Sequence, residues 1–193
     1  MKRATLVAVA LATLATTARS QPPIKAKLMG SPRLGQPAPA VILPAVAAVE
    51  CRGPSAECRA TEFRSSSELG HVLVLAFGGR PDPALKIDWA ALSRRADSLG
   101  SPRVVLVVVL RGGAREAQSL GGSLGGSLKI LADSGGRVHR QFGVSDRDRD
   151  WTIFVVADDG ILVDRERVNT LADGAWWVAV SAAIRRGVPA DSR

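Results

Sequence analysis

The sequence contains no tyrosine and has only two cysteines and two histidines. A structural zinc site usually takes four Cys or His ligands in closely spaced pairs, but His71 and His139 lie in separate segments. A scaffold held by many disulfides is excluded as well, because two cysteines can form only one disulfide. We therefore expect no metal and no cofactor in this chain.

The chain does carry enough apolar side chains for a folded domain. Of its 193 residues, 46% are hydrophobic and 23% are charged, which is typical of globular proteins. A domain of this size buries about two-thirds of its surface on folding and needs no covalent staple. These proportions exclude wholesale disorder and a collagen-like chain, and they predict one domain with short additional segments.

The first twenty residues have the pattern of a secretory signal peptide. Lys2 and Arg3 give a positive start, residues 4–17 form an apolar run, and Ala18 and Ser20 place small side chains where a signal peptidase reads the chain. We predict cleavage after Ser20 and a periplasmic or secreted protein. The alternative is an uncleaved membrane anchor. That run is shorter than the ~20 residues that span a bilayer, and no later segment reaches this length, so we expect no membrane span after cleavage.

Charge gives little support for a nucleic-acid partner. Loss of the signal peptide removes Lys2, Arg3 and Arg19 and lowers the net charge from +8 to +5. The other basic residues are scattered, and Asp and Arg alternate in the densest stretch, residues 146–150. A nucleic-acid-binding protein would cluster its basic residues. We therefore expect no nucleic-acid partner and interpret residues 146–150 as a solvated loop.

Residues 21–33 are rich in Pro, Lys and Gly and show little periodicity, which predicts a flexible leader. We assign residues 34–188 to one domain and residues 189–193 to a tail. Within the domain, residues 72–77 and 104–110 are unbroken apolar runs of strand length. Unbroken runs predict strands that are buried on both faces of a sheet.

The elements between and after these two runs predict the fold class. Residues 83–99 have near-helical apolar spacing, so strand, helix and strand predict a right-handed βαβ unit. An extended segment near residues 40–43 precedes this unit. Five elements follow it: a helix at 114–120, an apolar piece at 128–131, a short helix around Val138, His139 and Phe142, a hairpin of 152–156 with 161–163, and a helix at 171–186. This order predicts an α/β, thioredoxin-like, three-layer fold: a mixed sheet, βαβ plus a β-hairpin, with helices on both faces.

Four stretches of the sequence resemble the redoxin branch of the thioredoxin-like superfamily, which includes alkyl hydroperoxide reductase and thiol-specific antioxidant proteins. Residues 34–41 are similar to its Gly-x-x-Ala-Pro-x-Phe motif, and residues 70–77 to the buried strand before its active-site cysteine. Residues 131–144 are similar to its Leu-x-Asp to Tyr-Gly-Val segment, and residues 152–160 to its last hairpin. The resemblance covers residues 34–186. It implies a thioredoxin-like fold with a reactive thiol after the strand that ends at Phe77.

The sequence departs from the family at the thiol itself. Redoxins carry a Cys-x-x-Cys or a peroxidatic cysteine after that strand. Here Asp82 and Leu85 occupy the two positions of the first pattern, and Lys86 occupies the position of the second. The family's cis-proline, which lies opposite the thiol, falls at Trp151, so we expect a trans bond and a differently shaped loop there. Both halves of the usual redox site are absent from the sequence.

The two cysteines, Cys51 and Cys58, lie upstream of that strand. In an exported chain, such a pair predicts a local disulfide. By a chain-entropy argument, closing so short a loop stabilises the folded state by roughly 2–3 kcal/mol. The alternative is a displaced redox pair that Arg52 and Arg59 activate.

Two polar residues after the strand at 72–77 have more than one interpretation. Asp82 could act as a general base, and Arg80 could hold an anion at the start of the next helix. Asp82 also precedes Pro83, which is the arrangement of an N-cap followed by proline at the first helical position. We favour the capping role for Asp82.

The Gly-Gly-Ser repeats of residues 120–127 contain the residue types of a phosphate loop. They lack its Gly-x-x-x-x-Gly-Lys-Ser/Thr spacing before Lys129, so we interpret them as a flexible connector. Neither His71 nor His139 accompanies a Ser or Cys motif, which gives no support for a catalytic triad.

The tryptophans offer a choice between a core and a binding surface. Trp89, Trp176 and Trp177 are predicted to bury their faces against the sheet. The alternative is an aromatic surface patch for a partner, because two adjacent side chains on a helix point in different directions.

These observations support three hypotheses of different classes. The first, which we favour, is an exported thioredoxin-fold protein that lacks the thiol site, is redox-silent and binds a protein or peptide partner of the cell envelope. The second is a periplasmic thiol-disulfide oxidoreductase or peroxiredoxin-like antioxidant enzyme that uses Cys51 and Cys58. The third is a non-redox anion binder that uses Arg80 and the adjacent helix end.

Overall fold

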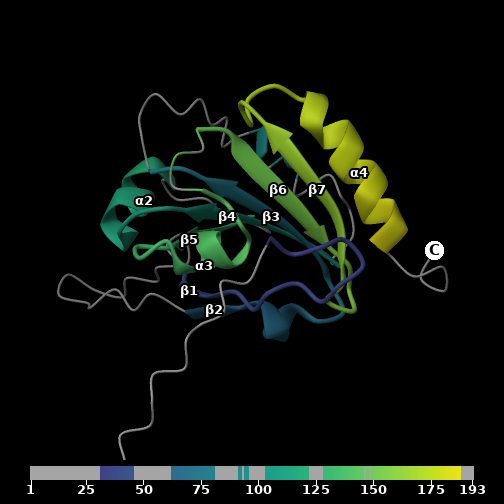
Figure 1. Ribbon diagram of the computed structural model, residues 1–193. Coiled ribbons are helices and arrows are strands. Elements are labelled where there is room, and N and C mark those ends of the chain that lie inside the picture. Colours follow the sequence, from purple (N-terminus) through teal and green to yellow (C-terminus); the bar gives the residue numbers. More distant parts are fainter. Residues whose placement is uncertain are drawn as a thin grey trace, which may run out of the picture.

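The computed structural model describes residues 31–45, 62–80, 91–92, 94–95, 103–121, 128–145, 147 and 149–187, and only the backbone of 118–121. Its centre is a five-stranded sheet with the strand order β5-β4-β3-β6-β7 (Figure 1). The strands are β3 (Val72–Gly78), β4 (Val104–Leu110), β5 (Leu128–Ala132), β6 (Trp151–Val156) and β7 (Leu162–Val168), and a separate short pair consists of β1 (Ile42–Pro44) and β2 (Glu62–Arg64). The helical elements are η1 (Ser65–Glu68), α2 (Ala114–Gly121), α3 (Arg137–Gln141) and α4 (Ala175–Gly187).

The middle of the sheet consists of β3 and β4, where the sequence predicts strands covered on both faces. Every residue of the two strands is buried. They pair in parallel, from Val72 opposite Val104 to Gly78 opposite Leu110, and β5 continues the parallel arrangement beside β4. The two predicted strands are therefore confirmed. Apolar side chains at every position suit a strand whose two faces are both covered by other layers of the fold.

The antiparallel half of the sheet consists of β6 and β7, which form the predicted hairpin. Ala157 N donates to Ile161 O at 2.8 Å and closes the turn between them. β6 also pairs antiparallel with β3, which makes the sheet mixed, as expected. β7 extends to Val168, beyond the predicted strand at 161–163. Its later residues, Asp-Arg-Glu-Arg, escaped sequence analysis because an edge strand carries charged side chains where a central strand cannot.

Side chains of the sheet divide into two hydrophobic clusters, one on each face. Val74 and Ala76 belong to the cluster that also contains residues of α2 and α4, whereas Leu75 and Phe77 belong to the cluster with β1, β2 and α3. Figure 1 shows α4 packed along β6 and β7 on one face. The predicted α/β fold, with a mixed sheet between two outer layers, is thus confirmed.

The start of α4 and one short strand also differ from the expectation. α4 begins at Ala175, later than the predicted start at 171. Thr170 Oγ1 accepts a hydrogen bond from Ala172 N, and Asp173 Oδ1 accepts one from Ala175 N, each at 3.1 Å. Such side-chain bonds hold the backbone in turns ahead of the helix. The sequence did not predict β2, because three residues are too few to show a period.

The predicted helix at 83–99 is only partly described. Residues 91, 92, 94 and 95 are helical, and the other positions lie outside the described residues. Within the part of the chain that the structure describes, no helix is both long enough and apolar enough to cross a membrane.

Candidate functional site

Three parallel strands end at the same edge of the sheet. Gly78 of β3 lies beside Leu110 of β4, and Leu110 lies beside Ala132 of β5. The loops that follow these residues leave the sheet together, and in open α/β sheets ligands bind outside the carboxyl ends of such strands. The side chains of these loops are therefore the first candidates for a site.

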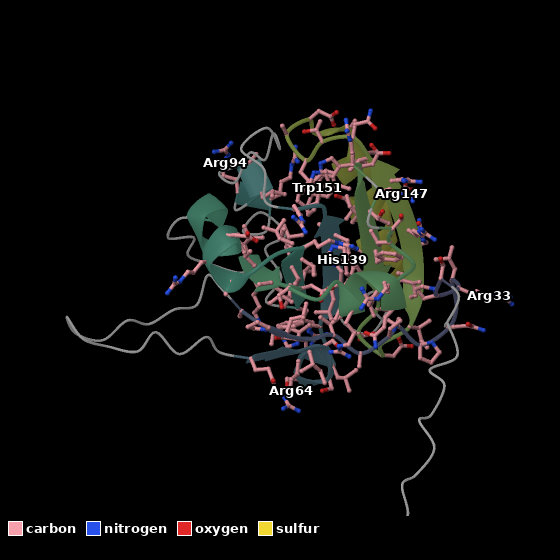
Figure 2. The ribbon with its side chains drawn as sticks, turned by 60° about the vertical axis from the view of Figure 1, so that its left-hand side comes forward. Arg33, Arg64, Arg94, His139, Arg147 and Trp151 are labelled. Carbon is pink, nitrogen blue, oxygen red and sulfur yellow. The ribbon has the colours of Figure 1, made fainter. Side chains whose placement is uncertain are left out.

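His139 of α3 lies beneath this edge, with only 1% of its surface exposed. Its Nε2 is 2.8 Å from the carbonyl oxygen of Gly78, and its Nδ1 is 2.8 Å from Asp133 Oδ2. A carbonyl oxygen only accepts, so Nε2 carries a hydrogen and donates it. When the ring is protonated, Nδ1 also donates, to the carboxylate of Asp133. Figure 2 shows His139 in the interior of the molecule.

Asp133, which follows β5, is the partner of this ring. Burial raises the pKa of its carboxyl group. The hydrogen bonds and the electrostatic attraction from His139, together with the backbone N–H of Arg137, lower the pKa by more than burial raises it, so the pKa lies below the ordinary 3.8. Oδ1 accepts from Arg137 N at 3.0 Å and Oδ2 accepts from His139 N at 2.9 Å. The carboxylate thus holds the first turn of α3, and through the ring of His139 it links α3 to the end of β3.

Trp151, the first residue of β6, packs against Gly78 from the other face of the sheet. Its side chain is fully buried and belongs to the cluster with α4. A β-carbon at Gly78 would overlap the six-membered ring of Trp151, so this close approach requires glycine. Every peptide bond among the described residues is trans. The space that faces Gly78 on this side is therefore filled by the indole.

An open pocket of about 480 Å³ lies at the same edge. Arg80 after β3, Arg111 after β4 and Arg140 in α3 line it, and Glu116 of α2 supplies an acidic group. The rest of the lining comes from Gly112, Gly113, Ser134, Gly135 and Gly136. The pocket has the volume of a small-ligand site, and its lining is charged, which suits a polar ligand better than an apolar one.

Two guanidinium groups approach the same point above Gly136. A β-carbon at Gly136 would lie 3.2 Å from Arg111 Nη1 and 3.3 Å from Arg140 Nη1. Gly136 has a left-handed backbone with φ of 60°, which favours glycine. Arg140 Nη1 donates to Gly135 O at 2.8 Å, which fixes one side of its guanidinium. Two positive charges held this close create an attractive position for an anion.

The structure locates some of the residues that the sequence singled out. Arg80 lies in the pocket, and Trp151 lies behind Gly78. Cys51, Cys58, Asp82, Leu85 and Lys86 lie outside the described residues, so the disulfide, the redox pair and the capping role stay predictions.

The remaining candidates are apart from this edge. His71 lies at the start of β3 and lines a smaller, mostly apolar pocket of about 180 Å³. Lys129 forms an ion pair with Glu68. Trp176 is buried against the sheet, and the ring of Trp177 packs on it edge-to-face at 5.2 Å. The predicted core role is therefore confirmed for Trp176, and Trp177 is partly buried beside it.

Two parts of the site are not predicted from the sequence. Asp133 and His139 lie in one segment that resembles redoxins, and an aspartate followed by a histidine on the next short helix is the only local signal of their contact. Arg111 and Arg140 carry no such signal, because they belong to segments far apart in the chain and no local motif joins them.

No family model matches the sequence, and no curated protein does. Solved structures do match. Mycobacterium bovis AhpC superposes with a TM-score of 0.64 at 16% identity, covering 80% of this chain and 93% of that one. A Chlorobium tepidum protein assigned as the thiol:disulfide interchange protein DsbE gives 0.59 at 16% identity, covering 82% and 100%. The reduced 2-Cys peroxiredoxin of Plasmodium vivax gives 0.58 at 17% identity, covering 79% and 96%.

The chain has the thioredoxin-like fold. Its structural neighbours are redoxins, in agreement with the resemblance that the four sequence stretches indicate. At this level of identity the likeness defines the thioredoxin-like fold, and the chemistry has to come from the residues of this chain.

Proposed function

We propose that this chain is an exported, redox-silent thioredoxin-fold protein that binds a protein or peptide partner through the arginine-lined pocket. The observation that carries the proposal is the convergence of Arg111 and Arg140 above Gly136, with Arg80 lining the same pocket. Guanidinium groups bind carboxylate and phosphate oxygens through paired, charge-assisted hydrogen bonds. The partner therefore presents a negatively charged group to this edge of the sheet.

Two observations support binding in place of thiol exchange. The sequence has no cysteine after Cys58, so no thiol follows β3 at the edge where the pocket lies. The buried ring of Trp151 occupies the space behind Gly78, and the sequence resemblance aligns Trp151 with the proline of redoxins. A protein with this edge has the fold of a redoxin, but the edge presents arginine side chains that can bind a negatively charged group.

Export is supported by the sequence pattern at the amino terminus. The charged start, the apolar run and the small residues before position 21 are those of a cleaved signal peptide. The pair Cys51 and Cys58 is consistent with an oxidising compartment, where a local disulfide persists.

The test begins with crosslinking of the tagged protein in intact cells, identification of the crosslinked partner, and titration of the purified partner. Arg80→Ala and Arg111→Ala should each weaken that binding by about tenfold. Arg186→Ala is the matched control, because Arg186 pairs with Asp164 at 2.9 Å at the opposite end of the sheet. Equal affinity of the Arg80→Ala variant and the control would contradict the proposal.

The same protein tests the thiol alternative. Partner binding should survive replacement of both Cys51 and Cys58 by Ser. A reductant-dependent peroxidase or insulin-reducing activity that Cys58→Ser abolishes would overturn the redox-silent proposal. The reduction potential of the pair gives an independent check: below about −300 mV marks a structural disulfide, whereas roughly −120 to −270 mV marks a working oxidoreductase.

A further inference from the structure

We infer that the group recognised by the arginine-lined pocket is a doubly charged oxyanion of the phosphate type, and that Glu116 tunes its affinity. This inference rests on the proposed function, because it names the chemistry of that same site. It follows from the charge of the lining, the arrangement of the three arginines and the place of the one carboxylate.

The charge of the lining sets the charge of the ligand. Arg80, Arg111 and Arg140 contribute three positive charges and Glu116 contributes one negative charge, which leaves the pocket at +2. A single carboxylate would balance half of this charge. A phosphate monoester carries about −1.5 to −2 at pH 7 and balances nearly all of it.

The arrangement of the arginines also favours phosphate. They come from three different segments that line one pocket: the loop after β3, the loop after β4, and α3. Arg111 and Arg140 nevertheless converge above Gly136. A planar carboxylate presents two oxygens in one plane, whereas a tetrahedral phosphate presents three acceptor oxygens in different directions. Three arginines arranged in this way match the second shape.

Glu116 holds a position that an anion would also favour. Its Oε2 accepts a hydrogen bond from Gly113 N at 2.9 Å, at the start of α2, and its side chain lines the pocket. The partial positive charge at a helix start attracts negative groups. The carboxylate of Glu116 therefore repels an incoming oxyanion and competes with it for the Gly113 N–H. Removal of this charge should strengthen binding.

Calorimetric titration of the mature chain at low ionic strength tests the ligand class. The probes are inorganic phosphate, sulfate, malonate and acetate. Phosphate should bind at least about tenfold more tightly than acetate, and more tightly at pH 7.5 than at pH 5, because a larger fraction of it carries two negative charges at the higher pH. Malonate carries two carboxylates and therefore two negative charges, but it lacks the tetrahedral shape of phosphate, so it distinguishes the effect of ligand charge from that of ligand shape. Tighter binding of malonate than of phosphate, or no binding of phosphate, would overturn the inference.

Variants then test the assigned residues with the same phosphate probe. Arg80→Ala and Arg140→Ala should weaken phosphate binding about three- to tenfold, and Arg186→Ala should leave it unchanged. Glu116→Gln should strengthen it about three- to tenfold, because Gln keeps the size of the side chain but removes the charge. An unchanged or weaker affinity of Glu116→Gln would overturn its role as the tuning residue.

The outcomes also separate this inference from the proposed function. Partner binding that depends on Arg80 without any phosphate binding would leave the proposed function standing and end the phosphate assignment. Phosphate binding with the expected variant effects, together with partner binding that is insensitive to Arg80→Ala, would support the anion site and remove the docking role.

Discussion

The two histidines of the chain lie at opposite ends of β3 and meet opposite surroundings. At the carboxyl end, both ring nitrogens of His139 have partners, and the arginine-lined pocket lies at the same edge. At the amino end, His71 lines a mostly apolar pocket, and its buried Nδ1 has no hydrogen-bond partner within the described part of the chain. The comparison shows that the buried, hydrogen-bonded histidine and the arginine-lined pocket share one end of the sheet, where the loops after the parallel strands meet.

The largest effect should come from weakening the buried pair of Asp133 and His139 at the carboxyl end. Asp133→Asn keeps the shape of the side chain but removes the carboxylate that meets the backbone N–H and the ring of His139. We expect the free energy of unfolding to fall by about 2–4 kcal/mol, measured by urea denaturation followed by circular dichroism. A loss below about 0.5 kcal/mol would show that the pair contributes little to the folded state.

A second, smaller effect should come from the glycines below the arginines. Gly136→Ala places a β-carbon near Arg111 and Arg140 and strains a left-handed backbone, so we expect a loss of about 1–2 kcal/mol in thermal denaturation and weaker phosphate binding. Gly135→Ala is the control, because nothing lies within 4 Å of a β-carbon there. Equal losses for the two variants would contradict the described convergence of the guanidinium groups.

The pH dependence of stability should carry the signature of Asp133. Its folded-state pKa lies below the ordinary 3.8, so the stabilisation from its ionised form is fully present above about pH 5 and is lost as the pH falls through the folded-state pKa. Urea denaturation at a series of pH values from about 6 down to 2 should show this decline in wild type and a shallower one in Asp133→Asn. Parallel curves for the two proteins would rule out a contribution from this carboxyl group.

The smallest effect should come from the other histidine. His71→Leu replaces a ring whose buried Nδ1 lacks a partner with an apolar side chain in a mostly apolar pocket. We expect a change below about 1 kcal/mol, in the stabilising direction, by the same denaturation measurement. A large loss would mean that His71 has an important partner and that the contrast between the two ends of β3 is weaker than described.

The two halves of the sheet also differ in how far the sequence predicts them. β3 and β4 were predicted because their unbroken apolar runs have the length of a strand and are rich in valine, which is β-branched. β7 was predicted only at its start, because its charged later residues are those of an edge strand. The pocket was not predicted, apart from Arg80, because Arg111 and Arg140 meet only after the chain has folded.

Trp151 constrains two positions of the sheet at once. Its buried ring fills the space against Gly78, so a β-carbon at Gly78 would overlap the indole. A small side chain in place of Trp151 would leave a cavity, at a cost of about 3–5 kcal/mol for changes of the Trp→Ala kind in cores. Any redesign of this end of β3 therefore has to change the two positions together.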